Sequence, residues 1–545
     1  MMMRRILPVL ILVASLVLAL MGLGKAAYWD DEAFTAIVAR NWLATGTLTG
    51  WDGRNLLGYR NGALLNEDLK PRNPPLEYYA TAISFRLFGE TTASGRLPFV
   101  IAGFASLLVF MQILRDECPD ANTFHTYSLA ALGLSVPFLL YVRQCHYYSL
   151  SLFFSLLTYW TYRRLLDRST WKAAFTLGLS AAGTYFAHYL LSVAFLLSIA
   201  VVHFLFERKR LFQVAHAKCA APLFLFILLA VPHAWHNQIW RRPDYLPSDP
   251  WYLRKPLLVW WYLRDLNLGG FFPWTLGLVA MVVFWIHREH PVAKTGVRFA
   301  SLAITYSLVL GLLSPQPTDN AGNPVADVRY LVPMLGFLAG VSGATFALVD
   351  RYTRLTACLL LALLVGTNLL FLTPWRSEPR WLLPAYVHEI IHDYPTPYEA
   401  IATFLHQHAG QDDAVTVLPD YANYPILFYA GDKVRIACQL AKDSTIPEEV
   451  WKNLPSPLDY DECFPKWLIA CGLHPQVRPW LEHFSRPHLE GNRTVQYRYQ
   501  LVHVLPIHWD QTQRPELHLH SFRPPSTKDN ESARVFIFQR IGTTP

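Results

Sequence analysis

Long apolar stretches separated by short polar segments occupy the first two thirds of the chain. Most approach the roughly 20 residues that an α-helix needs to cross the hydrocarbon core of a bilayer. The pattern therefore predicts a polytopic α-helical membrane protein with about eleven transmembrane helices. The stretches cover residues 6–24, 97–114, 126–142, 147–162, 173–187, 189–206, 219–235, 271–286, 299–313, 330–349 and 355–372.

The first stretch, residues 6–24, has two readings, a signal peptide or a first spanning helix. It is longer than the apolar core of a usual signal peptide, and no small-residue cleavage site follows before the polar segment that starts at Tyr28. We therefore expect a spanning helix.

Basic residues recur in alternate short loops. If the N-terminus is cytoplasmic, four of these loops lie inside, where Lys and Arg are enriched. The pattern places residues 25–96, residues 236–270 and everything after residue 373 outside, and it predicts a multi-pass protein of the cell (inner) membrane. The inside residues are Arg163, Arg164, Arg168 and Lys172; Arg208, Lys209, Arg210 and Lys218; Arg288, Lys294 and Arg298; and Arg351 and Arg354.

Composition agrees with a membrane protein. Hydrophobic residues make up 52% of the chain and charged residues 16%, and the mean hydropathy is +0.20, which argues against a soluble enzyme. The net charge of +7 arises from short clusters between apolar stretches, so we expect no nucleic-acid partner. No cysteine pair has zinc-site spacing. Cys438, Cys463 and Cys471 could form a disulfide in an oxidising compartment, but spacing does not say which.

The last part of the chain is polar. Residues 398–408 read as an amphipathic helix, 414–418 as a strand, 424–429 as a helix or a strand, and 534–539 as a closing strand. These elements predict two domains: a membrane domain at residues 1–375 with a large outer loop at about 25–96, and an extracytoplasmic α/β domain at residues 376–545.

Three consecutive acids follow the first apolar stretch directly. Asp30, Asp31 and Glu32 would lie at the outer membrane surface, where adjacent carboxylates raise one another's proton affinity. Such a cluster suits a base or a cation site. The alternative is a solvated acidic loop.

Four short motifs follow one another in order. The outer loop opens with the acidic cluster and contains PPLEYY at 74–79, and SGRLP follows at 94–98; RQCHYYSL at 143–150 and VRYLVP at 328–333 start later helices. Together they resemble the GT-C superfamily of membrane glycosyltransferases, most closely the bacterial relatives of protein O-mannosyltransferase and aminoarabinose transferase. The resemblance covers most of residues 1–375.

This resemblance implies transfer of a sugar from a polyprenyl-phosphate carrier to an acceptor on the outer face, with inversion at the anomeric carbon. It makes Asp31 the base, with Asp30 a close competitor, and allows Glu32 and Asp30 to tune the site or hold a divalent cation. Relatives often carry Lys or His before the two prolines, where this chain has Asn73, so the nearest cations there are Arg72 and Lys70.

A lipid-phosphate leaving group needs fixed cations near the headgroup plane. Arg143 and Arg329 lie at outer ends of spans, against the usual charge bias, and are candidate phosphate ligands. The alternative is that they reach lipid headgroups or pair with nearby acids. Tyr330 adjoins Arg329.

Four histidines remain. His146 and His188 fall near outer helix ends and could bind phosphate or a sugar hydroxyl, although a structural role is the common one. His233 and His236 lie one turn apart, a spacing too common to predict a metal site. The aromatic tract at 251–268 reads as an interfacial helix that either packs on the outer leaflet or guides a lipid donor.

These observations favour a glycosyltransferase that uses a polyprenyl-phosphate sugar, contacts membrane lipids and acts on an acceptor that the sequence does not name. The rivals are a transporter or flippase of lipid-linked glycans, a ligase or polymerase of surface polysaccharide, and a scaffold without activity. A transporter would carry ionisable residues near mid-membrane, whereas the polar groups here gather at one face.

Overall fold

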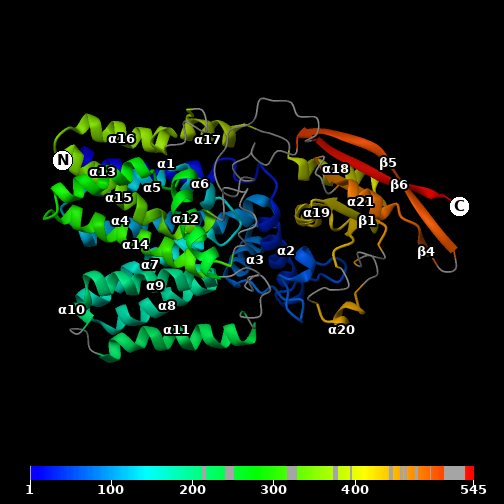
Figure 1. Ribbon diagram of the computed structural model, residues 1–545, viewed down its shortest axis with the longest axis horizontal. Coiled ribbons are helices and arrows are strands. Elements are labelled where there is room, and N and C mark those ends of the chain that lie inside the picture. Colours follow the sequence, from blue (N-terminus) through cyan, green and yellow to red (C-terminus); the bar gives the residue numbers. More distant parts are fainter. Residues whose placement is uncertain are drawn as a thin grey trace.

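The computed structural model describes residues 2–211, 216–237, 239, 251–315, 328–371, 379–392, 396–440, 446–454, 458, 463–472, 477–490, 493–508 and 534–544. A bundle of helices forms one end of the molecule and a β-sheet the other, with a layer of short helices between them (Figure 1). The N-terminus lies at the far end of the bundle and the C-terminus at the far end of the sheet.

Each predicted apolar stretch overlaps a helix of the bundle. The expected aromatic helix at 251–268 coincides with α12. The helices are α1 (Met2–Leu20), α4 (Thr92–Glu117), α5 (Asn122–Gly133), α6 (Val136–Val142), α7 (Tyr148–Arg168), α8 (Trp171–Ala187), α9 (Tyr189–Phe206), α10 (Arg208–Leu211), α11 (His216–His236), α12 (Trp251–Leu268), α13 (Trp274–Ile286), α14 (Pro291–Leu313), α15 (Leu335–Asp350), which follows the 3₁₀ helix η4 (Val328–Met334), and α16 (Arg354–Gly366), which η5 (Leu369–Phe371) follows.

Four of the described helices are long and apolar enough to cross a membrane. They are α4, α9, α14 and the continuous segment Val328–Asp350. The bent pair α5–α6 brings the number to five. The chain is thus an integral membrane protein with several apolar helices, and the figure of about eleven spans stays a prediction.

The stretch 126–142, expected as one helix, is two helices that meet at 58°. Pro137 lies in the first turn of α6. A proline there has no backbone N–H to continue the preceding helix, and its ring disfavours helical geometry in the residue before it. The break sets α6 and the turn after it at an angle that brings His146 toward the outer loop.

The outer loop at 25–96 is mostly helical. It forms α2 (Asp30–Thr45), η1 (Tyr59–Gly62) and α3 (Leu76–Phe88), and its helices lie between the bundle and the sheet (Figure 1). The sequence predicted no helix here, because α2 buries residues all round instead of along one apolar stripe.

The C-terminal part contains a six-stranded sheet of order β2-β1-β3-β6-β5-β4. Strand β1 is parallel to β2 and β3, whereas β6 is antiparallel to β3 and β5. The strands are β1 (Asp413–Leu418), β2 (Val434–Ile436), β3 (Trp467–Cys471), β4 (His488–Glu490), β5 (Arg493–His508) and β6 (Arg534–Thr544); the helices are α17 (Leu382–Ile391), α18 (Pro397–His408), η6 (Asp420–Ala422), α19 (Asn423–Ala430), α20 (Glu448–Trp451) and α21 (Val477–Phe484).

The four elements expected in this part are present: α18, β1, α19 as a helix, and β6. Elements β3, α21, β4 and β5 fall in a region where many prolines and aromatic residues hid them from the sequence analysis. Cys438 and Cys463 form a disulfide, and Cys471 is buried as a free thiol. The structure thereby decides a pairing that spacing left open.

One hydrophobic core runs through both parts of the molecule. Phe34 of α2 packs on Tyr424 of α19 with ring centroids 5.6 Å apart, and Tyr28 packs edge-on against Phe428 at 5.0 Å. Buried Asn55 of the outer loop donates to the carbonyl of Gly431 and accepts from the N–H of Ile436 in β2. The C-terminal part is therefore held against the outer helices by packed side chains and hydrogen bonds.

Candidate active site at the outer end of the helical bundle

The first turn of α2 carries the acidic cluster. A helix N-terminus presents unpaired N–H groups and a partial positive charge, which favours acidic side chains there. Asp31 is one-third exposed, and its Oδ2 lies 2.7 Å from Nη1 of Arg329 in η4. The predicted base and a predicted phosphate ligand, nearly 300 positions apart in the chain, thus form an ion pair.

His146 stands beside this pair in the turn between α6 and α7. Its side chain is buried, its Nε2 lies 3.8 Å from Oδ2 of Asp31, and its Nδ1 lies 2.7 Å from Oε2 of Glu77 in α3. Thr35 Oγ1 lies 3.3 Å from the same Nδ1. The imidazole therefore lies between two carboxylates from different helices.

Aromatic rings border the cluster on one side. Arg329 Nη1 donates to the Tyr148 hydroxyl at 3.5 Å, and the Arg329 guanidinium stands 5.7 Å from the ring centre of Tyr330. His188 packs on Tyr147 at 4.4 Å and on Tyr330 at 5.4 Å. Predicted residues Asp31, Arg329, Tyr330, His146 and His188 are thus brought together from four chain segments.

Glu32 has a different environment from its two neighbours. It forms a fully buried ion pair with Arg96 of α4, at 2.6 Å between Nη2 and Oε2, and its Oε1 also accepts the backbone N–H of Cys145. Arg96 donates further to the carbonyls that end the α1–α2 connection. These contacts anchor the start of α2, and the predicted place of Glu32 among the catalytic acids stays a prediction.

Asp30 is half-buried beside Asp31. Burial, together with the neighbouring Asp31 carboxylate, raises the pKa of Asp30 well above its usual value. The C-terminal part reaches this carboxylate: burial raises the pKa of Tyr398 in α18, and the charge of Asp30 raises it further. Asp30 therefore lies where the outer helices meet the C-terminal part.

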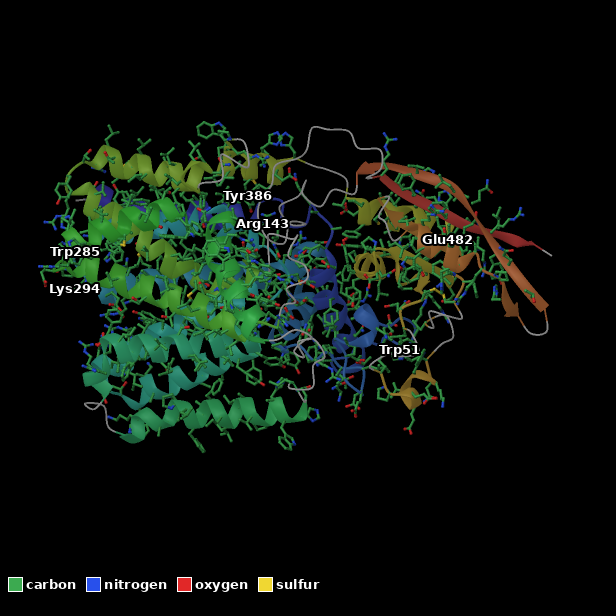
Figure 2. All side chains as sticks on the ribbon, in the orientation of Figure 1. Trp51, Arg143, Trp285, Lys294, Tyr386 and Glu482 are labelled. Carbon is green, nitrogen blue, oxygen red and sulfur yellow. A yellow bond between two sulfur atoms is a disulfide. The ribbon has the colours of Figure 1, made fainter. Side chains whose placement is uncertain are left out.

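Arg143 contacts the end of α1 in the structure, and its predicted role as a phosphate ligand stays a prediction. Its side chain is buried (Figure 2), and its guanidinium donates to the carbonyls of Leu18, Ala19, Met21 and Gly22 at the C-terminal end of α1. A cation there satisfies carbonyls that the helix leaves unpaired. The predicted topology placed Arg143 at the same end of the bundle as Asp31, as in the structure. It could not show that the Arg143 side chain points into the protein, toward the end of α1.

The cations before the two prolines also have other contacts. Lys70 forms an ion pair with Asp68 at 3.1 Å, and buried Arg72 donates from Nε to the carbonyl of Leu65. Both contacts lie within the outer loop. Their substrate-binding roles stay predictions.

Sequence reasoning missed Glu77, Thr35, Tyr147 and Tyr148 as neighbours of the base. Glu77, Tyr147 and Tyr148 lie inside the motifs that carried the resemblance. The sequence offered one signal for this neighbourhood, Glu77 among apolar and aromatic residues. A carboxylate buried in such surroundings needs a partner. Their common location follows from the folding of α2, α3 and the α6–α7 turn against one another.

No set of three or more acidic, histidine or cysteine side chains suited to a metal ion occurs among the described residues. The Asp31 oxygen nearest His146 already contacts a guanidinium, which would repel a cation at that oxygen. The described residues do not fit a divalent cation at this site, and no step below uses one.

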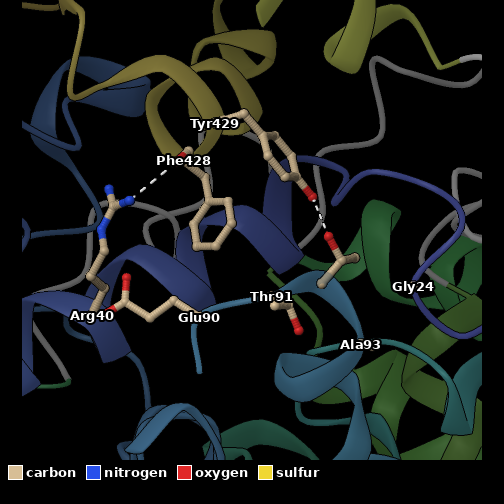
Figure 3. A pocket seen from close by; sticks show the side chains of 8 residues that line it. Gly24, Arg40, Glu90, Thr91, Ala93, Phe428 and Tyr429 are labelled. Carbon is tan, nitrogen blue, oxygen red and sulfur yellow. Dashed lines mark hydrogen bonds between the residues drawn. The ribbon is translucent and has the colours of Figure 1, made fainter. Parts of the chain in front are cut away.

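A cleft of about 380 Å³ opens where the outer helices meet the C-terminal part (Figure 3). Arg40 of α2 donates to the carbonyl of Phe428, and the Tyr429 hydroxyl lies 2.7 Å from Oγ1 of Thr92. The exposed carboxylate of Glu90 lies on the same wall (Figure 3). The cleft thus combines both charges, hydroxyls and aromatic rings.

In its fold, the chain is similar to members of the GT-C superfamily of membrane glycosyltransferases. Residues 72–236 match the family described as dolichyl-phosphate-mannose-protein mannosyltransferase. No curated protein matches the sequence. The resemblance predicted from the four motifs is confirmed.

Two solved structures show the likeness of fold. ArnT from Cupriavidus metallidurans, bound to undecaprenyl phosphate, superposes with a TM-score of 0.51 at 14% identity, over 89% of this chain and 96% of that chain. The archaeal oligosaccharyltransferase AglB from Archaeoglobus fulgidus, in complex with an inhibitory peptide and a dolichol-phosphate, superposes with a TM-score of 0.50 at 12% identity, over 87% of this chain and 70% of that chain.

Proposed function

We propose that this protein transfers a sugar from a polyprenyl-phosphate donor to an acceptor on the extracytoplasmic face of the membrane. The observation that carries the proposal is the pairing of Asp31 with Arg329 beside His146, at the outer end of a GT-C bundle. Two proteins of this fold were solved with polyprenyl-type phosphates bound, which supports the same donor class here.

The ion pair supplies both groups that the reaction needs. The donor phosphate binds Arg329 through charge-assisted hydrogen bonds and so competes with Asp31 for the guanidinium. Asp31 is then free to accept the proton of the acceptor nucleophile. The nucleophile attacks the anomeric carbon from the side opposite the phosphate, the carbon–oxygen bond to phosphate breaks, and the polyprenyl phosphate leaves with the electron pair and with inversion.

Two features support the proposed orientation of the chain. Lys294, from a loop expected inside, lies at the opposite end of the molecule from Glu482 of the C-terminal part (Figure 2). The disulfide between Cys438 and Cys463 suits an oxidising compartment. We therefore propose a cytoplasmic N-terminus and a periplasmic C-terminal part in the inner membrane.

For the acceptor we propose the side of the site that faces the C-terminal part. Ligands of open α/β sheets bind beyond the carboxyl ends of parallel strands, and Tyr398, close to Asp30, also lies near Cys471 at the end of β3. The cleft lined by Arg40, Glu90 and Tyr429 opens at the same junction. Its mixed charges and hydroxyls suit a polar acceptor.

The decisive experiment incubates purified protein in nanodiscs with a panel of radiolabelled polyprenyl-phosphate sugars and extracted envelope acceptors. Asp31→Asn should slow transfer roughly 10³-fold but keep donor binding. Asp167→Asn is the matched control, because its ion pair with Arg210 lies at the other end of the bundle. Equal transfer by wild type and Asp31→Asn would remove Asp31 as the base. Movement of labelled lipid across the bilayer, without transfer, would identify a flippase instead.

A further inference from the structure

Glu77 and His146 form a buried pair behind the proposed base. Glu77 lies in the first turn of α3 and His146 in the α6–α7 turn, and their side chains are 2% and 7% exposed. Only 2.7 Å separates Oε2 from Nδ1. Contact between two ionisable groups at this depth is costly unless each compensates the other.

The second ring nitrogen of His146, Nε2, lies on the side of the proposed base, Asp31. Nε2 lies 3.8 Å from Oδ2 of Asp31, so the proposed transfer requires the two side chains to approach one another to hydrogen-bond distance. The charged and titratable groups around the ring are Asp31 from α2, Glu77 from α3, Arg329 from η4, and Tyr147 and Tyr148 at the start of α7. The order of groups is carboxylate, imidazole, carboxylate.

We propose that His146 takes the acceptor's proton onward from Asp31, and that Glu77 is a positioning residue that acts through His146. The inference rests on the proposed function and deepens it. A carboxylate beside Nδ1 favours the tautomer with its proton on Nδ1, which leaves Nε2 as the proton acceptor, and it stabilises the imidazolium that forms.

The proton balance closes without a further reagent. The acceptor O–H bond breaks as its oxygen bonds to the anomeric carbon, and the proton moves to Asp31. It then passes from Asp31 to Nε2 of His146, which gives an imidazolium between two carboxylates. Asp31 is ionised again and re-forms its ion pair with Arg329 once the lipid phosphate leaves. The imidazolium finally releases its proton to water.

A purely structural pair would explain the same contact, since it joins α3 to the α6–α7 turn. The two readings differ in measurable ways. A structural pair affects stability and leaves the pH profile unchanged. A relay affects kcat and its pH profile, with little effect on the KM for the donor.

The test compares Glu77→Gln, His146→Gln and the double variant in nanodiscs. Each single variant should lower kcat by roughly 10²-fold, with the donor KM changed by less than about 2-fold. The double variant should be no slower than His146→Gln alone, because residues that act as a unit are non-additive. Glu77→Asp should restore part of the rate. His406→Gln is the control, an exposed histidine 3.9 Å from Asp432 in the C-terminal part.

The pH profile gives a second readout. A relay makes the pH profile of kcat/KM depend on Glu77, because the carboxylate that Glu77→Gln removes lies 2.7 Å from the ring. The acid limb of the profile should therefore move in that variant. Independent, multiplying effects of the two substitutions, or an acid limb that does not move, would overturn the relay.

A third readout does not depend on turnover. The ¹⁵N signals of labelled imidazole in nanodiscs should show His146 with its neutral-state proton on Nδ1 in wild type, and a mixture of tautomers in Glu77→Gln. If transfer fails with every donor, the proposed function falls, and this signal still tests the pair. If transfer proceeds but the tautomer is unchanged in a folded Glu77→Gln protein, the positioning role of Glu77 is wrong.

Discussion

Two clusters of charge lie at opposite ends of the bundle, and they are built differently. At the inner end, Glu117 and Glu207 each contact both Arg163 and Arg298, at distances of 2.5–3.1 Å, and no side chain of the four is more than 18% exposed. At the outer end, Asp31 has one close cation, Arg329, and is 33% exposed.

The number of partners per charge distinguishes a cluster that joins helices from the cluster that we propose takes part in the reaction. The inner cluster joins α4, α7, α14 and the end of α9. Arg163, Arg298 and Glu117 each contact two opposite charges, and Glu207 contacts a third arginine, Arg210, at 3.3 Å. Such a network of paired charges holds helices together. The outer cluster has fewer partners per charge, which suits the proposed replacement of Asp31 by a phosphate at Arg329. In the proposed function, the acid that takes part in the reaction is thus one that can exchange its partner.

Removing the outer carboxylate should have the largest effect on rate. Asp31→Asn should lower kcat roughly 10³-fold, because general-base catalysis contributes about 10²–10⁴. Its melting temperature in nanodiscs should stay within a few degrees of wild type, since the side chain is partly exposed. If Asp31→Asn instead lowered the stability strongly and kept a normal kcat per folded molecule, Asp31 would have the structural role that we assign to the inner cluster.

Removing an inner carboxylate should lower the stability and leave kcat unchanged. Glu117→Gln leaves Arg163 and Arg298 to share one acid, and breaking a buried ion pair costs about 3–5 kcal/mol. Thermal unfolding in nanodiscs should show the loss, while the folded fraction keeps its kcat. The comparison fails if Glu117→Gln slows transfer as strongly as Asp31→Asn.

The outer arginine should govern donor affinity. Arg329→Gln removes charge-assisted hydrogen bonds worth about 2 kcal/mol, which corresponds to roughly 30-fold weaker binding of polyprenyl phosphate. Titration of the lipid phosphate alone measures this. Arg164→Gln, an inner-end arginine over the ring of Trp160, should leave binding unchanged. Unaltered affinity in Arg329→Gln would show that the phosphate binds elsewhere.

The smallest expected effect concerns Asp30. The raised pKa of Asp30 means that its contribution to stability is present at low pH and is lost as pH rises through its folded-state pKa. Asp30→Asn removes that loss, so the variant should melt on the order of 1 °C higher than wild type at pH 8–9 and equally at pH 4. If the difference in melting temperature between Asp30→Asn and wild type grew toward acid pH, the expected pH dependence would be wrong.

The sequence predicted the site only in part. It named Asp31, Arg329, Tyr330, His146 and His188, which the structure brings together, and their roles stay predictions. The resemblance favoured Asp31 over Glu32 as the base, but only the packed neighbours show that Glu32 is the acid that meets Arg96.

Hydropathy by itself determined that this is a membrane protein and roughly where its apolar helices lie, although α14 begins eight residues before its predicted start. Those features follow from local composition, because each span must match the bilayer on its own. The tertiary structure decided the break between α5 and α6, the inward turn of Arg143, the burial of α2, and the meeting of Asp31, Glu77, His146 and Arg329. These depend on contacts between segments far apart in the chain, which no local pattern encodes.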